Sequence, residues 1–149
     1  NHNDGTSYLD LVDFIKSNSI QPNKDLEELW NRLVFSILIS NTDDHLRNHD
    51  FVLSENGWKL SPLFDVNPNP LGKELSLNIT EDNNLKQLSL ALDTAKYYNL
   101  PLEKAKNNAT RIAAVVMNNW RRLAKLNGCS ASEIERMQPA FEDKFVTTL

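Results

Sequence analysis

Residues 26–50 read LEELWNRLVFSILISNTDDHLRNHD, and they decide the fold because an apolar helical pattern passes directly into a polar segment. The apolar residues of the first half recur at helical spacing: Leu26, Leu29, Trp30, Leu33, Val34, Ile37 and Leu38. This pattern predicts a helix that begins near a cap at Asn23 and runs to about Ile39. Since Phe35 and Ile39 widen the apolar stripe, we expect this helix to be largely buried and to form the backbone of the fold.

The polar half, residues 41–50, holds nine polar or charged residues around a single Leu46. A solvated loop at a helix end explains such a composition, and so does a functional site carried on a rigid support. Downstream, residues 51–53 and 58–60 are short strand candidates, and Asn56-Gly57 between them is a strong hairpin signal. Residues 61–70, SPLFDVNPNP, contain three of the six prolines and therefore predict an irregular loop.

Further elements are predicted on both sides of this centre. Upstream, Ser7 can cap a short helix that ends near residues 17–18. Residues 75–79 alternate apolar and polar side chains, as a short strand or an extended segment does. A helix is then expected to start at residue 82 or 83 and to run to about Tyr98.

The last part of the chain predicts two more helices. Pro101 suits the first turn of a long helix, and Gly128 is its natural stop. Ser130 and Glu133 form a capping-box pattern for a final helix, which Pro139 should kink or divide. Its apolar residues are Ile134, Met137, Phe141 and Phe145.

Length and composition fit one globular domain of residues 1–149. Sixteen basic residues oppose twenty acidic ones, and a net charge of −4 argues against nucleic acid or an anionic membrane as the main partner. One cysteine, Cys129, excludes a disulfide framework and fits a reducing cytoplasm. Since the sequence has no stretch of about 18 uninterrupted apolar residues, a membrane span is not expected.

Three oxygen-bearing side chains are spaced in a way that suits phosphoryl transfer. Asn48 follows Asp43 by five positions, and Asp65 comes after the predicted hairpin. The reaction needs a carboxylate that accepts a proton from the attacking hydroxyl, together with hard oxygen ligands that hold Mg²⁺ against a triphosphate. An aspartate, an asparagine and a second aspartate supply these groups, in the order seen in the general protein-kinase pattern.

A closer resemblance lies in the same residues. The stretch TDDHLRNHDFVL followed by WKLSPLFDV, together with SYLDLVDFI upstream, resembles the C-terminal lobe of the HipA family of serine/threonine kinases, the toxins of bacterial toxin–antitoxin pairs. The resemblance implies that Asp43 is the catalytic base and that His45 lies near the transferred phosphate. It implies that Asn48 and Asp65 are the Mg²⁺ ligands, with ATP as the phosphate donor.

The fold and partners follow from the same resemblance. It implies a mainly α domain with a small β-hairpin at its active edge, the C-terminal (large) lobe of a bilobal protein-kinase-like fold. The chain contains no glycine-rich phosphate loop, strand lysine or partner glutamate, which in the family belong to an N-terminal lobe. The resemblance further implies a protein substrate, a role in persistence, and a DNA-binding antitoxin of HipB type. Direct DNA contact is expected at most within that antitoxin complex.

Other functions remain open from the residues alone. A small-molecule phosphotransferase of the aminoglycoside or choline kinase type shares the Asp-x-x-x-x-Asn loop, and a non-catalytic pseudokinase lobe is suggested by the second carboxylate at Asp44. His45 and His49, four residues apart, could instead bind a transition metal if they lay on a helix. The basic residues after Trp120 could meet an acidic partner, although such charges more often complement a helix C-terminus.

Overall fold

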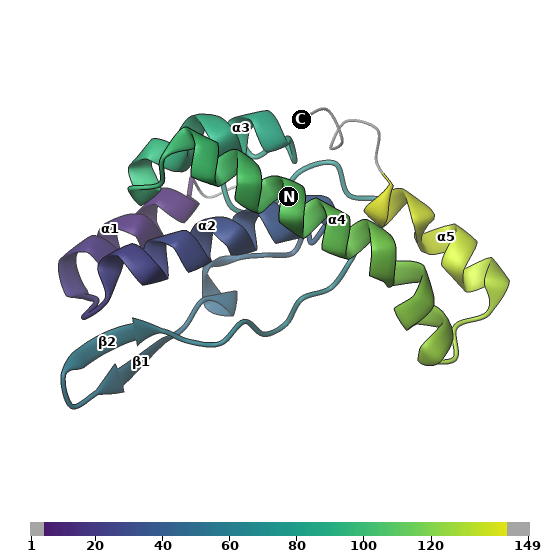
Figure 1. The fold of residues 1–149 in the computed structure, drawn as a ribbon, viewed down its shortest axis with the longest axis horizontal. Helices are drawn as coiled ribbons and strands as arrows, with labels where there is room; N and C mark the ends of the chain where they lie inside the picture. The colour runs from purple at the N-terminus through teal and green to yellow at the C-terminus, as the bar shows by residue number, and fades with distance from the viewer. Residues whose placement is uncertain (1–4, 143–149) are drawn as a thin grey trace.

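The protein is a mainly helical domain with one β-hairpin in the described part of the chain. A computed structural model describes residues 5–142. Figure 1 shows the elements in chain order: α1 (Tyr8–Asn18), α2 (Pro22–Leu38), the 3₁₀ turn η1 (Leu46–Asn48), β1 (Phe51–Ser54), β2 (Gly57–Leu60), α3 (Leu88–Thr94), the 3₁₀ turn η2 (Ala95–Tyr98), α4 (Leu102–Leu126) and α5 (Ala131–Phe141). The predicted mixture of helices and a small hairpin is confirmed.

Helix α2 lies at the centre of the packing. It contacts α1, α3, α4, η2 and β2, and the side chains of Leu26, Leu29, Leu33 and Ile37 are fully buried. Trp30 is equally buried, and its indole N–H donates a 2.9 Å hydrogen bond to the carbonyl oxygen of Ala91 in α3. The prediction of a buried central helix is therefore confirmed. Because this helix is closely packed, it gives rigid support to the polar segment that follows its C-terminus.

The helix starts were predicted with unequal success. The predicted cap at Ser7 and the predicted capping box of Ser130 and Glu133 are confirmed, and Asp10 completes a capping box at α1 that was not predicted. The cap predicted at Asn23 was wrong, because Pro22 already occupies the first helical position of α2. The long helix ends as expected, at Asn127 followed by Gly128 with φ +85°.

The helix expected from residue 82 or 83 begins only at Leu88. The intervening backbone pairs instead with the extended residues 75–79. The N–H groups of Leu75 and Ile79 donate to the carbonyl oxygens of Asn84 and Asn83, and the Asn84 side chain donates to the Leu75 carbonyl. Because these non-helical hydrogen bonds compete with a first helical turn, the helix signals of the sequence were overridden here. Leu75, Leu77 and Ile79 reach the core, as their alternation predicted.

The hairpin is antiparallel, with Ser54 opposite Gly57 and Phe51 opposite Leu60. Gly57 has φ +122°, and a Cβ there would lie 2.6 Å from the Ile20 side chain, so the turn requires glycine. Buried Asp25 of α2 fixes the strand end, since its carboxylate accepts a 3.0 Å hydrogen bond from the Leu60 N–H. The loop that leaves β2 thus starts from a position set by the central helix.

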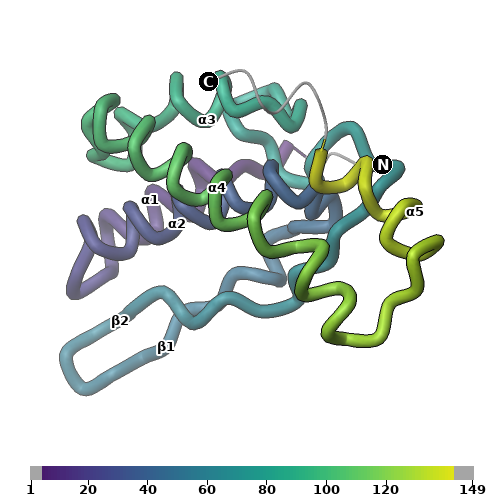
Figure 2. Tube along the Cα trace, turned by 45° about the vertical axis from the view of Figure 1, so that its right-hand side comes forward, coloured from purple at the N-terminus to yellow at the C-terminus, as the bar shows by residue number. Residues whose placement is uncertain are grey.

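The first half of α4 packs on the body, and its C-terminal half forms with α5 an arm at the end opposite the hairpin (Figure 2). Trp120 stacks on Phe141 at 4.5 Å between ring centroids, and Arg121 lies over Trp120 and pairs with Glu142 at 2.7 Å. Part of the basic helix end therefore serves the packing of the arm. Pro139 lies within α5 without dividing it, and Phe145 is outside the described residues.

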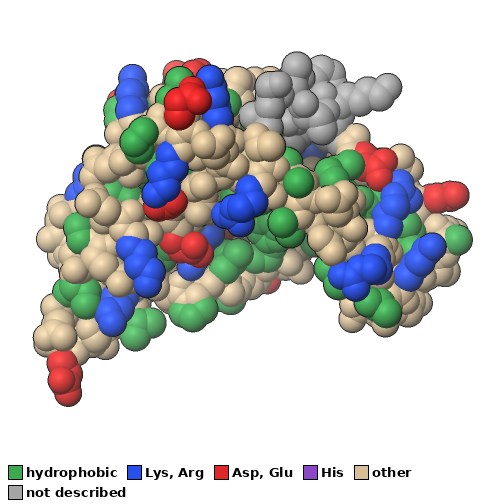
Figure 3. Space-filling model, in the orientation of Figure 1, with side chains coloured by type: hydrophobic (Ala, Val, Ile, Leu, Met, Phe, Trp, Pro, Cys, Tyr) green, Lys and Arg blue, Asp and Glu red, His purple; other side chains and the backbone are tan. Residues whose placement is uncertain are grey.

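An apolar cavity of about 680 Å³ separates the arm from the body. Its lining includes Phe35 of α2, Trp120 of α4, and Val66 and Pro68 from the loop after the hairpin. Figure 3 shows the hollow on this face, with hydrophobic side chains toward the body. Among the described helices, none is both long and apolar enough to cross a membrane.

Candidate active site

The polar segment after α2 is held in an irregular path by its own backbone. Ser40 adopts a left-handed conformation with φ +54°, and the N–H of Asn41 donates to the Ser36 carbonyl at 2.8 Å. Residues 46–48 then form the single turn η1 before β1 begins. A non-glycine residue with positive φ is costly, and such residues gather at functional sites. The composition of this segment fitted a solvated loop, whereas the structure shows a loop with a defined, ordered path.

Asp43 and Asn48 lie at the two ends of this loop and are connected. The Asn48 amide nitrogen donates to the main-chain carbonyl of Asp43 at 3.3 Å. Asn48 is buried, whereas the Asp43 side chain is exposed to solvent. The five-residue spacing therefore corresponds to a loop closed on itself, which fixes the amide of Asn48 and leaves the Asp43 carboxylate accessible.

Asp65 lies on the neighbouring loop, residues 61–70, and is exposed. Its backbone is left-handed with φ +53°, and its carboxylate accepts a 2.9 Å hydrogen bond from the Asn67 side chain. Aspartate tolerates this conformation better than most residues, but it remains unusual. The sequence predicted an irregular loop here, and the structure adds a specific backbone geometry at its aspartate.

Side-chain hydrogen bonds join the two loops. The Asn41 amide oxygen accepts from the Asn67 N–H at 3.2 Å. Asn69 donates from its side chain to Thr42 Oγ1 at 2.8 Å and from its backbone to the Ser40 carbonyl at 3.0 Å. These contacts tie the segment carrying Asp43 to the segment carrying Asp65, although 22 positions separate the two aspartates in the sequence.

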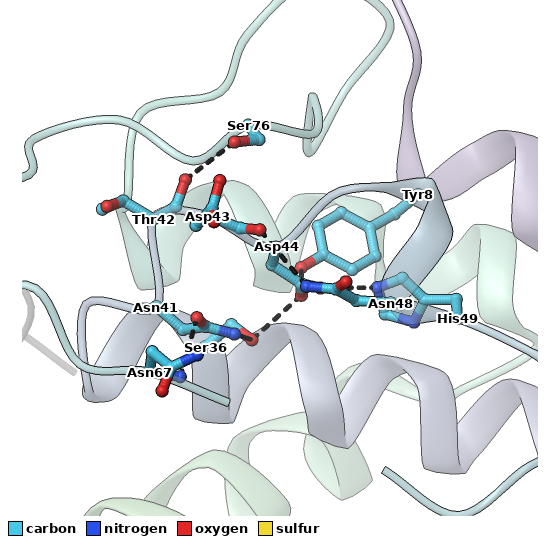
Figure 4. Close-up of polar contacts among 10 residues, drawn as sticks. All are labelled: Tyr8, Ser36, Asn41, Thr42, Asp43, Asp44, Asn48, His49, Asn67 and Ser76. Carbon is cyan, nitrogen blue, oxygen red and sulfur yellow. Dashed lines mark hydrogen bonds and ion pairs between the residues drawn. The ribbon is translucent and has the colours of Figure 1, made fainter. Parts of the chain in front are cut away.

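Asp44 points into the interior and not toward the Asp43 carboxylate (Figure 4). Its buried carboxylate accepts hydrogen bonds from the Tyr8 hydroxyl of α1 and from Ser36 Oγ of α2, the latter at 3.1 Å. The buried His49 also approaches it, with 2.8 Å between His49 Nε2 and Asp44 Oδ1. One carboxylate thereby anchors the loop to two helices.

This anchor was missed in the sequence. Tyr8 and Ser36 were never candidates, because Tyr8 precedes Asp44 by 36 positions and Ser36 sits in an apolar helical pattern. Ser36 extends the network toward the second loop, since its hydroxyl accepts from the Asn41 side chain at 3.4 Å. Two features of the sequence could have indicated this anchor: a tyrosine at the start of a helix and a serine inside an apolar stripe.

The buried contact between Tyr8 and Asp44 predicts how the Tyr8→Phe substitution changes the stability of the protein at alkaline pH. Burial, and then the nearby Asp44 charge, raise the pKa of Tyr8 well above its ordinary value. The folded state therefore keeps this proton at pH values where the unfolded state releases it. The stabilising contribution is complete below about pH 10 and declines above it.

In denaturant titrations from pH 9 to 11.5, we expect the Tyr8→Phe protein to lose stability less steeply. The difference should be up to about 1.4 kcal/mol per pH unit, the limit for one proton. Burial also raises the pKa of Tyr98, so part of the decline will remain. Tyr97→Phe, at an exposed tyrosine of the same turn as Tyr98, is the matched control. Equal slopes for Tyr8→Phe and the unmodified protein would contradict the assignment.

The two histidines do not form a transition-metal site. His49 lies beside Asp44, while His45 precedes η1 and its buried Nδ1 has no hydrogen-bond partner in the described residues. Within residues 5–142, no three side chains of His, Cys, Asp or Glu are arranged to hold a metal ion. The oxygen ligands available at this edge are instead an amide and a carboxylate, from Asn48 and Asp65, a set that suits Mg²⁺.

Fold and loops together define a class: a mainly helical domain whose central helix leads into two joined, oxygen-rich loops beside a β-hairpin. The profile of the HipA-like C-terminal domain matches residues 1–120. The chain belongs to this family, as the residues of the polar loop indicated.

A similar protein comes from Sinorhizobium fredii (strain NBRC 101917 / NGR234) and is named "Putative kinase Y4mE". The two sequences are 26% identical over 62 residues, which are 42% of this chain and 15% of that protein. The chain thus aligns with only a small part of that relative's length.

Proposed function

We propose that the chain is the C-terminal catalytic lobe of a HipA-like serine/threonine kinase. In this proposal an N-terminal lobe of the complete protein supplies the remaining contacts to ATP, and a HipB-type antitoxin is the partner. The observation that carries the proposal is the pair of joined loops, because they hold an accessible carboxylate beside a fixed amide and a second aspartate. Family membership supports the same reaction class.

Each residue has a defined role in this proposal. The Asp43 carboxylate accepts the proton of the acceptor hydroxyl, and its exposure gives the acceptor access. Asn48 would hold Mg²⁺ through its amide oxygen, since its nitrogen already donates to Asp43. Asp65 would be the carboxylate ligand, and His45 would lie near the transferred phosphate. When bound, Mg²⁺ neutralises charge that develops on the phosphate oxygens.

The reaction is a transfer of the γ-phosphoryl group to a protein hydroxyl. The acceptor oxygen forms a bond to the γ-phosphorus, the bond to the bridging oxygen breaks, and ADP leaves with the electron pair. The test is phosphate transfer from labelled ATP by the complete gene product, with autophosphorylation and protein acceptors both monitored. Transfer to aminoglycosides or choline alone would favour the small-molecule phosphotransferase, and absence of Mg-nucleotide binding would favour a pseudokinase.

Asp65→Asn should raise the Mg²⁺ concentration needed for half-maximal transfer. An amide oxygen carries no full charge, so we expect an increase of about tenfold or more, with part of the lost rate restored at high Mg²⁺. The measurement is a Mg²⁺ titration of phosphate transfer at saturating ATP. Asp50→Asn, an exposed aspartate of the neighbouring loop, should leave the Mg²⁺ dependence unchanged. The same Mg²⁺ requirement in both variants would remove Asp65 from the metal site.

A further inference from the structure

A second cavity opens directly beside the proposed base. It has a volume of about 630 Å³ and is lined by Thr42 and Asp43 on one side and by residues of segment 69–76 on the other. An acceptor hydroxyl must come within hydrogen-bond distance of Asp43, and this cavity is one approach that brings it there. The side chains of segment 69–76 would then meet the groups that flank the hydroxyl.

Segment 69–76 is held against Thr42 at three points. Asn69 donates to Thr42 Oγ1 at 2.8 Å, and Ser76 Oγ donates to the Thr42 carbonyl at 2.8 Å (Figure 4). Between them, Gly72 approaches so closely that a Cβ would lie 2.3 Å from Thr42 Cγ2. The wall of the cavity is therefore fixed in place next to Asp43, and its shape depends on a glycine.

The fixed wall presents an apolar side chain to solvent. Leu71 is 88% exposed, more than any other large hydrophobic residue in the described part of the chain. Its N–H is fixed by a 3.0 Å hydrogen bond to Asn69 Oδ1, so the exposed side chain belongs to an ordered segment. A single exposed leucine is common on protein surfaces, but this one lines the cavity that contains the base.

The charges around the cavity favour an acceptor without a strong charge of its own. Lys73 and Glu74 follow Leu71 with opposite signs, and both are exposed. A polycationic small molecule such as an aminoglycoside would need several carboxylates, whereas the lining offers only Glu74 besides the base. A neutral polypeptide segment with an apolar side chain fits this lining better, because its apolar group can cover Leu71.

We propose that segment 69–76 selects the acceptor: a serine or threonine in a polypeptide, next to an apolar side chain that packs on Leu71. This inference rests on the proposed kinase function, which already takes a protein serine or threonine as the acceptor, and adds the kind of side chain that lies beside it. The hydroxyl enters the cavity, its proton passes to the Asp43 carboxylate, and its oxygen takes the γ-phosphoryl group of ATP while ADP leaves. Leu71 is a specificity residue that touches the acceptor beside its reacting hydroxyl.

The experiment measures transfer from labelled ATP by the complete gene product to matched serine peptides. The residues flanking serine are leucine, aspartate or lysine in otherwise identical sequences. We expect leucine-flanked peptides to be preferred by about tenfold in kcat/KM, the size of discrimination that an apolar contact provides. Leu71→Asp should abolish this preference mainly through KM, and Leu71→Met should retain it. Leu126→Asp, an exposed leucine at the end of α4, is the matched control.

Three outcomes separate the inference from the function on which it rests. If Leu71→Asp keeps the wild-type preference for leucine while melting at the same temperature, the inference is wrong and the kinase proposal stands. If the wild-type enzyme phosphorylates small molecules but none of the peptides, the substrate class is wrong. If no acceptor and no autophosphorylation site receives phosphate, the proposed function fails and the inference fails with it.

Discussion

Asp43→Asn should lower phosphate transfer by about 10²–10⁴-fold, the usual contribution of a positioned general base. The amide has nearly the same shape as the carboxylate but cannot accept the proton of the attacking hydroxyl. Because the Asp43 side chain is exposed, the replacement should leave folding unchanged. The loop contact from Asn48 should persist as well, since it is made to the main-chain carbonyl of residue 43.

The measurement compares transfer from labelled ATP by the complete gene product and its Asp43→Asn variant, with nucleotide binding followed separately. We expect transfer to be lost while Mg-ATP binding is retained, which distinguishes a chemical defect from a binding defect. Asp50→Asn provides a control of the same charge change at an exposed position after the loop. Transfer by Asp43→Asn within about threefold of the wild-type rate would exclude Asp43 as the base, given the size of that contribution.

Elements with local signals were predicted well from the sequence. The caps at Ser7 and Ser130, the apolar stripe of α2, the hairpin and the end of α4 each depend on residues within a few positions of one another. Family membership followed from a similarly local set of residues, since the polar loop and the loop after the hairpin carried the resemblance. The profile match over residues 1–120 confirmed it.

Elements that depend on contacts outside the helical and strand patterns were not predicted. The start of α3 moved to Leu88 because residues 83 and 84 hydrogen-bond with the extended segment 75–79. The roles of Tyr8 and Ser36 were missed because their positions mark them as unusual polar residues without indicating that each contacts the carboxylate at position 44. Asp44 itself was interpreted as a second negative charge beside Asp43, whereas the fold turns its side chain inward.

Because Asp44 anchors the loop, we expect substitutions at the adjacent residues Asp43 and Asp44 to have very different effects on the free energy of unfolding. Asp44→Ala would leave the Tyr8 hydroxyl, the Ser36 hydroxyl and His49 without their buried partner. A buried polar group that loses its hydrogen-bond partner costs about 1–3 kcal/mol of unfolding free energy, and several groups would lose theirs here. Domains of this size are stable by only about 5–15 kcal/mol, so a large share of the total would be lost. Asp43→Ala, one residue earlier and exposed, should change stability by less than about 0.5 kcal/mol.

Denaturant titration of the purified variants would test this, and a double-mutant cycle with Tyr8→Phe isolates the pair. If the hydroxyl and the carboxylate act together, Tyr8→Phe should destabilise the wild-type protein more than it destabilises Asp44→Ala, with a coupling of about 0.5–3 kcal/mol. Additive effects would mean that the contact contributes nothing net. Since the same carboxylate is connected through Ser36 and Asn41 to the second loop, its loss should displace Asp43 and Asp65 together. Asp44→Ala should therefore lose activity together with stability, whereas Asp43→Asn should lose activity while fully folded.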